Sequence, residues 1–250
     1  MSDPLLTYLL RLGDDSLILA QRLGELVSHQ PDLEEDIAVA NLALDLIGQA
    51  RALYAYAGEV EGRGRTEDDL AFLRDEREFF NAVLCEQPNG DFGQTMARQL
   101  LFDAYRLPLM DALTASADET ISGVAGKAVK ECRYHLQHSI TWVVRLGDGT
   151  EESHRRMQAG LDAMWRFTDE LFTGDEVEAT LAASGIAVDP SSLRDPWEAT
   201  IKEVLARATL ERPVDPRQRG GGRQGMHSEH LGHILPEMQF LQRAYPGQSW

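Results

Sequence analysis

The chain has 250 residues, with 41 acidic against 24 basic side chains and a formal net charge of −17. Nucleic acids and anionic membrane surfaces need a basic footprint, so this charge argues against both as partners. No apolar run approaches the ~18 residues of a membrane span. The first four residues hold no basic region, so we expect no secretory signal. The two cysteines, Cys85 and Cys132, indicate buried thiols in a reducing cytoplasm rather than a disulfide framework.

Apolar residues recur with the helical period along almost the whole chain, and no alternating strand pattern appears. In chain order, helices are predicted over residues 4–28, 32–57, 66–86, 92–115, 118–146, 150–172 and 175–184, then from 196 onward, and finally over 228–243. Gly58 is expected to end the second helix and Pro108 to kink the fourth. Residues 217–224 combine Arg and Gln with three glycines, which predicts a flexible basic loop.

The predicted helices are long for a globular protein, and neither a domain linker nor a repeat interrupts them. We therefore predict an all-α fold, namely a ferritin-like four-helix bundle with additional helices. A single domain is expected over residues 1–250. Its bundle core would cover about residues 4–146, and the additional and C-terminal helices about residues 150–245.

Polar side chains interrupt the apolar stripes of the four long helices. They are Glu25 in the first helix, Asn41 and Asp45 in the second, Asp103 in the fourth, and Glu131, His135 and His138 in the fifth. One carboxylate from each of four long helices is the outline of a ferritin-like dimetal site. The outline raises the question of whether the acidic residues are metal ligands.

A di-iron carboxylate site needs two Glu-x-x-His units, because residues three apart on a helix can reach the same metal. The second helix instead has Asp45 followed by Gly48, which has no imidazole. The fifth has Glu131 followed by Tyr134, with His135 one position late. The pattern predicts a degenerate site that has lost its metal.

Two other readings of these carboxylates stay open at this point. One reading is a neutralised or hydrogen-bonded interior network formed by Asp45, Asp103 and Glu131. The other is a metal site that these three carboxylates still form. Lys127 and Lys130 lie one turn before Glu131 and could replace the charge of a lost metal, since a buried carboxylate needs a partner.

The remaining histidines give weaker signals. His227, His230 and His233 are spaced three apart and would spread over about 120° of a helix, which is wide for a common ligand set. We expect them at a surface or partner interface. The pair Glu151 and His154 has the Glu-x-x-His spacing but opens an amphipathic helix, so a solvated first turn is expected. No phosphate-binding loop or nucleophile motif appears, and no catalytic residue is predicted.

Ten segments of the sequence carry a resemblance to a known family. They are residues 11–15 (RLGDD), 44–51 (LDLIGQAR), 74–79 (RDEREF), 86–92 (EQPNGDF), 130–136 (KECRYHL), 165–168 (WRFT), 185–190 (GIAVDP), 225–232 (GMHSEHLG), 237–243 (EMQFLQR) and 246–250 (PGQSW). In this order, and over essentially the whole chain, they resemble the C subunit of the bacterial phenylacetyl-CoA ring-1,2-epoxidases.

The resemblance implies a ferritin-like structural subunit in aerobic phenylacetate degradation, without a metal or cofactor of its own. In that family the C subunit pairs with a related A subunit, which carries the di-iron centre and the acyl-CoA site. A small B subunit and a reductase with FAD and an iron–sulfur cluster complete the complex, which epoxidises the aromatic ring with O2 and NADPH. His138 and His233 fall outside the family pattern, so no role is carried over to them.

The resemblance also suggests where phenylacetyl-CoA would contact this chain at a subunit interface. The segment Glu78, Phe79, Phe80 and Asn81 follows the family-like residues 74–77 and is the expected stretch. The alternative is that these four residues are ordinary helix and interface residues that do not contact the substrate. Two further alternatives concern the whole chain: a homodimer when isolated, and an independent ferritin-like dimetal oxidase or metal-binding protein.

Overall fold

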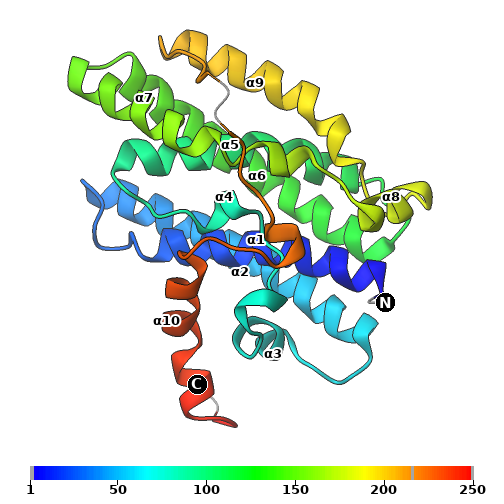
Figure 1. Cartoon of the computed structure of the whole chain (residues 1–250). Helices are drawn as coiled ribbons and strands as arrows, with labels where there is room; N and C mark the ends of the chain where they lie inside the picture. The colour runs from blue at the N-terminus through cyan, green and yellow to red at the C-terminus, as the bar shows by residue number, and fades with distance from the viewer. Residues whose placement is uncertain (1–2, 215–216, 249–250) are drawn as a thin grey trace. The chain divides into compact units, whose positions relative to one another are not determined.

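A computed structural model describes residues 3–214 and 217–248. Two predicted features lie partly outside the described residues. They are the N-terminus expected to hold no signal, at residues 1–2, and the tail motif, at Ser249 and Trp250. Every regular element of the described ranges is a helix (Figure 1), so the predicted all-α class is confirmed. None of these helices is long and apolar enough to cross a membrane.

The chain separates into two compact units, Met1–Gln87 with Gly220–Trp250 (unit 1) and Pro88–Arg219 (unit 2). The single ferritin-like domain therefore stays a prediction. The helical elements of unit 1 are α1 (Pro4–Gly24), α2 (Leu33–Glu61), α3 (Glu67–Phe72), η1 (Glu76–Glu78), α4 (Val83–Glu86), η4 (Gly222–Gln224) and α10 (Leu231–Ala244).

Unit 1 is built on the pairing of α1 with α2, two helices whose starts are capped by aspartates. Asp32 accepts a hydrogen bond from the backbone N–H of Glu35 at the start of α2, as expected. Gly13 lets the helices approach closely, because a Cβ there would lie 2.6 Å from the ring of Tyr54. The expectation that Gly58 ends α2 is wrong: the helix continues to Glu61 and ends at Gly62, whose φ is 67°.

The prediction of one continuous helix over residues 66–86 is wrong: the segment is broken into α3, the η1 turn and α4. Thr66 caps α3 as expected, but α3 ends at Phe72. The backbone N–H groups of Phe80 and Ala82 donate instead to the carboxylates of Asp14 and Asp15 on α1, at 2.7 Å each. Donors committed to α1 cannot pair within a helix, so tertiary hydrogen bonds override the local helical pattern.

The helical elements of unit 2 are α5 (Phe92–Leu113), α6 (Glu119–Gly147), α7 (Glu151–Trp165), η2 (Asp169–Phe172), α8 (Glu176–Ala183), η3 (Pro190–Leu193) and α9 (Arg194–Arg207). Helix α5 contacts α6, α7 and α9. Gly160 on α7 allows the close contact with α5, because a Cβ there would lie 2.7 Å from Cα of Gln94. Pro108 lies inside α5, near its C-terminal end.

An aromatic cluster explains why the sixth predicted helix stops early in unit 2. Helix α7 ends at Trp165, and Phe172 lies in the separate η2 turn. Phe172 packs edge-on against Trp197, with ring centroids 5.2 Å apart, and against Tyr105 at 5.9 Å. The indole N–H of Trp197 donates to the Leu101 carbonyl at 2.9 Å, so the cluster joins α5, η2 and α9 in one core.

Candidate functional site

The predicted dimetal positions in unit 1 lie toward solvent. Glu25 follows the last residue of α1 and forms an ion pair with Arg22, with 2.7 Å between Nη1 and Oε1. Asp45 and Gly48 on α2 are half-buried. Leu44 beside them is 63% exposed, so the expectation that this stripe of α2 is an inner face is wrong.

The predicted positions in unit 2 are divided between core and surface. His135 is buried, whereas the Tyr134 side chain is 53% exposed. Glu131 forms an ion pair with Lys127, with 3.6 Å between the ammonium nitrogen and Oε1, and the Lys127 side chain is 77% exposed. Lys130 is also exposed. The predicted cation beside Glu131 is therefore present, but in solvent.

Asp103 on α5 is the buried carboxylate of this set. Burial raises the pKa of Asp103 to about 7, although a hydrogen bond with Ser139 and the charge of Arg98 both lower it. Its Oδ2 atom has no hydrogen-bond partner within the described ranges. A carboxyl group whose pKa is raised by burial and that bonds to Ser139 agrees with the hydrogen-bonded reading of this position.

The donor set at these positions does not fit a di-iron centre. Gly48 offers no side chain, and Tyr134 stands where the second imidazole is required and is largely exposed. No cluster of three or more His, Cys, Asp or Glu within residues 3–214 and 217–248 is arranged to hold a metal ion. The degenerate site itself stays a prediction. Glu151 and His154 form the first turn of α7, where His154 contacts the Gly147 carbonyl.

A buried polar network in unit 1, missed by the spacing arguments, is centred on Asp14 of α1. Its carboxylate accepts hydrogen bonds from Arg74, from the Tyr54 hydroxyl at 2.5 Å and from the Phe80 backbone. The guanidinium of Arg74 also stacks on the Phe79 ring, 4.1 Å from its centroid. Burial lowers the pKa of Arg74, but its contacts with Asp14 and Tyr54 raise it more, so the guanidinium stays charged.

The neighbouring Asp15 is matched in the same way by a residue from the C-terminal part of the chain. Arg223 donates to both of its oxygens, at 2.8 and 3.0 Å. The predicted flexible basic loop over residues 217–224 is therefore wrong around Arg223, which lies in η4 and is held by this ion pair. Two adjacent charged residues in the middle of an apolar helix were the signal that could have revealed both contacts.

Glu86 on α4 forms the third part of the network. Its carboxylate accepts from the Ser228 backbone at 2.6 Å and from the Asn81 amide at 2.9 Å, and it contacts His227 Nδ1 at 2.8 Å. The His227 side chain is completely buried, so the expectation of a surface position is wrong for this residue. The histidine row is also broken, because α10 begins only at Leu231, after His230.

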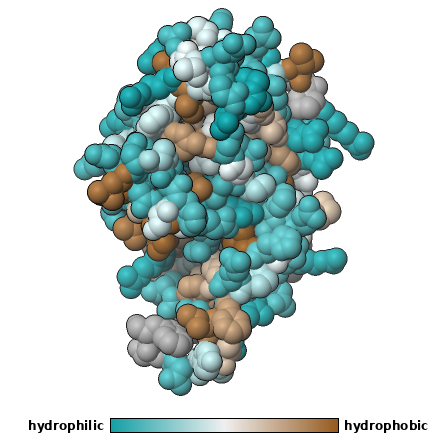
Figure 2. All heavy atoms as spheres, turned by 90° about the vertical axis from the view of Figure 1, so that its left-hand side faces the viewer, coloured by the Kyte–Doolittle hydropathy of each residue, from teal (hydrophilic) through white to brown (hydrophobic). Residues whose placement is uncertain are grey.

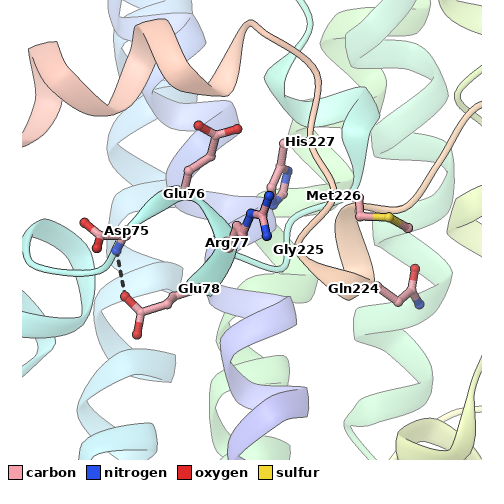
Figure 3. A pocket seen from close by; sticks show the side chains of 8 residues that line it. All are labelled: Asp75, Glu76, Arg77, Glu78, Gln224, Gly225, Met226 and His227. Atoms are coloured by element: carbon pink, nitrogen blue, oxygen red, sulfur yellow. Dashed lines mark hydrogen bonds between the residues drawn. The ribbon is translucent and has the colours of Figure 1, made fainter.

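An open pocket of about 910 Å³ lies beside this network. Figure 3 shows its lining, with Asp75, Glu76, Arg77 and Glu78 on one side and Gln224, Gly225, Met226 and His227 on the other. Of the expected acyl-CoA segment, Glu78 lines the pocket, while Phe79 and Asn81 are completely buried. Three carboxylates against one guanidinium disfavour the phosphates of CoA. Substrate contact at this segment stays a prediction.

Comparison with known proteins identifies the class of this chain. Residues 1–250 match the family of phenylacetic acid catabolic proteins, and the chain belongs to that family. The predicted ferritin-like, all-α fold class is confirmed together with this membership.

A curated relative narrows the class further. The chain is 51% identical over 246 residues to the C subunit of the 1,2-phenylacetyl-CoA epoxidase of Escherichia coli (strain K12), and the match covers 98% of this chain and 99% of the relative. The resemblance seen in the sequence is confirmed. Several of the segments that carried it contribute a residue to the buried network of unit 1: Asp14, Asp15, Arg74, Glu86 and His227.

Proposed function

We propose that this chain is the C subunit of a phenylacetyl-CoA 1,2-epoxidase and acts in it as a non-catalytic structural subunit. The observation that carries the proposal is the 51% identity to the C subunit of such an epoxidase over nearly the full length of both chains. In this proposal the chain scaffolds the catalytic A subunit during aerobic phenylacetate degradation in the cytoplasm.

The non-catalytic role is supported by the side chains at the dimetal positions. A metal needs several convergent ligands, but Gly48 and Tyr134 supply no imidazole, and Glu131 is paired with Lys127. Asp103 has its pKa raised to about 7 by burial, which suits a neutral hydrogen-bonded group better than a ligand carboxylate. The di-iron centre of the complex would therefore belong to the A subunit, and FAD, iron–sulfur and NADPH chemistry to the reductase.

The exposed face of α2 supports a role in assembly. Four large apolar side chains are exposed along this helix: Leu33 by 70%, Ile37 by 54%, Leu44 by 63% and Ile47 by 39%. Their spacing of four, seven and three residues places them on one side of a helix. The face of the molecule in Figure 2 is mostly hydrophilic, with apolar groups scattered among the hydrophilic ones. In the proposal, this side of α2 faces a partner subunit.

A reconstitution assay tests the proposal. Purified A and B subunits and the reductase are mixed with phenylacetyl-CoA, NADPH and O2, with or without this chain, and epoxide formation is measured. The proposal predicts turnover only when this chain accompanies the A subunit, and none from this chain with the reductase alone. Turnover by the chain and reductase without the A subunit would instead establish the alternative of an independent dimetal oxidase.

A matched pair of variants connects the assay to α2. Leu44→Glu places a charge on the exposed apolar side of the helix, so it should weaken co-purification with the A subunit and lower the reconstituted activity. Glu59→Gln, an exposed change on the same helix, is the control. Both variants should keep the helical content of the parent chain, which circular dichroism checks. Equal co-purification of both variants would remove this side of α2 from the interface.

A further inference from the structure

The C-terminal part of unit 1 begins with a segment that is bound closely to the rest of the unit. We call residues 221–228 the strap. Gly222 lies directly against the backbone carbonyl of Asn81, and a Cβ on Gly225 would lie 2.5 Å from the carbonyl oxygen of Arg77. Arg223 donates to Asp15 at one end of the strap. At the other end, the strap is held by His227.

Both ring nitrogens of His227 face hydrogen-bond acceptors. Nδ1 lies 2.8 Å from Oε2 of Glu86, and Nε2 lies 2.8 Å from the backbone carbonyl of Phe79. A neutral imidazole carries one N–H and can satisfy only one of these contacts as a donor. An imidazolium carries two and satisfies both.

The surroundings of Glu86 place the shared proton on the ring. Its carboxylate already accepts from the backbone N–H of Ser228 and from the side-chain amide of Asn81, at 2.6 and 2.9 Å. The Phe79 carbonyl can only accept. Each of the three carboxylates of the network also faces one basic side chain. The pairs are Asp14 with Arg74, Asp15 with Arg223, and Glu86 with His227.

We infer that His227 is a proton-dependent latch: the imidazolium closes the strap on unit 1, and its deprotonation loosens the strap. Residues Gln224, Gly225, Met226 and His227 of the strap line the pocket in Figure 3, so loosening removes one wall of that pocket. The opposite wall of the pocket, which includes Glu76 and Arg77, would remain in place. The latch thus couples pH to access at this surface, whichever partner binds there.

The electrostatic surroundings set the direction of the pH response. Burial lowers the pKa of His227, but the contacts with Glu86, the Phe79 carbonyl and the charge of Asp14 raise it above the ordinary value. The folded pKa of His227 lies above its unfolded pKa. The stabilisation of the closed strap by the latch is therefore complete below about pH 6.5, and this stabilisation is lost as the pH rises through the folded pKa. The other charged groups of the elements around the latch are Arg11, Asp15 and Arg22 on α1, Arg74, Glu76 and Arg77 on the segment after α3, and Arg223 on the strap.

Amide hydrogen exchange of the full chain between pH 6 and pH 9 tests the latch. After correction for the intrinsic pH dependence of exchange, the strap should open faster by up to about tenfold per pH unit between the open-state pKa of about 6.5 and the raised pKa of the closed state, because one proton is linked to closure. Peptides from α9 in unit 2, which holds neither a histidine nor Asp103, serve as the internal reference and should show no such change. Strap exchange that is independent of pH after correction would overturn the proposal.

Two variants assign the effect to the ring. His227→Gln keeps a donor but cannot be charged, so its strap should exchange fast at every pH, without the pH dependence of the parent chain. His233→Gln, a change on α10 outside the network, should behave like the parent. Should His227→Gln fail to fold, a pH titration of the ring ¹⁵N chemical shifts of the parent chain decides: a ring pKa above the ordinary value of about 6.5 supports the latch, and one at or below that value overturns it.

Discussion

Asp14 in unit 1 and Asp103 in unit 2 are both carboxylates buried in long helices, but their surroundings differ. The Asp14 carboxylate accepts hydrogen bonds from a guanidinium, a phenol and a backbone N–H. Asp103 is the residue that the dimetal outline selects; it is hydrogen-bonded to Ser139, and one of its oxygens has no partner among the described residues. Ligand-like spacing thus selects a carboxyl group whose pKa is raised by burial, while the network of ion pairs contains Asp14 and Asp15, which the ligand spacing does not select.

The largest effect is expected from breaking the charged network. Arg74→Met leaves Asp14 buried without its cation, and breaking a buried ion pair from one side costs about 3–5 kcal/mol of unfolding free energy. Chemical denaturation of the full chain measures it. Arg51→Met is the control, because Arg51 pairs with Glu67 at the surface of α2, where such a pair contributes about 0–1 kcal/mol. Equal losses in both variants would contradict the account of the network.

A smaller loss is expected from Tyr54→Phe, which removes only the hydroxyl that donates to Asp14. A hydrogen bond to a charged group contributes about 1.5–3 kcal/mol. The exposed Tyr134→Phe should leave the unfolding free energy unchanged. A Tyr54→Phe variant as stable as the parent would mean that the two contacts from Arg74 and Phe80 already satisfy this carboxylate.

Asp103→Asn should act in the opposite direction, increasingly as the pH rises above 3.8. Because the folded pKa of Asp103 is raised to about 7 from 3.8, the unfolded chain releases this proton first as the pH rises. The unfolding free energy of the parent chain should therefore fall between these two values, whereas Asp103→Asn removes that fall. At pH 8 the variant should be more stable by on the order of 1–2 kcal/mol. Asp111→Asn, exposed on the same helix, provides the control.

The smallest effect is expected at Lys127, the cation proposed to replace a lost metal. Its ammonium is mostly exposed and pairs with Glu131 over one helical turn. Such pairs contribute about 0.3–0.5 kcal/mol, so Lys127→Met should change thermal stability only slightly. A loss of several kcal/mol would show that Glu131 depends on this charge and would revive the idea of a structural substitute for the metal.

The long helices can be predicted from sequence because their packing follows their own periodicity. Asp32 and Thr66 also give correct N-terminal caps. The region after Phe72 cannot be predicted in this way. The donors of Phe80 and Ala82 bind carboxylates more than 60 residues earlier in the chain, and a local pattern carries no information about such distant partners. Gly58 is a similar case, because this glycine lies inside α2 and allows the close approach of the Arg65 carbonyl.

Two different signals in the sequence carry functional information. Ligand spacing shows that imidazoles are missing at Gly48 and Tyr134, but it says nothing of His227, whose role comes from Glu86 on a distant segment. The adjacent charges of Asp14 and Asp15 inside an apolar helix, and the resemblance of whole segments to a known family, are the signals that point to residues meeting in unit 1. The spacing of ligand residues on one helix therefore tests for a known type of metal site. The contacts of a network built from several distant segments are found only in the structure.

Iron content tests the central claim most directly. The chain is purified alone after expression with added iron, and again in complex with the A subunit, and the iron per chain is measured by atomic emission. The account predicts substoichiometric iron in the isolated chain and about two irons per A–C pair in the complex, as a single di-iron centre requires. Two irons bound at full occupancy by the isolated chain would contradict a non-catalytic structural subunit.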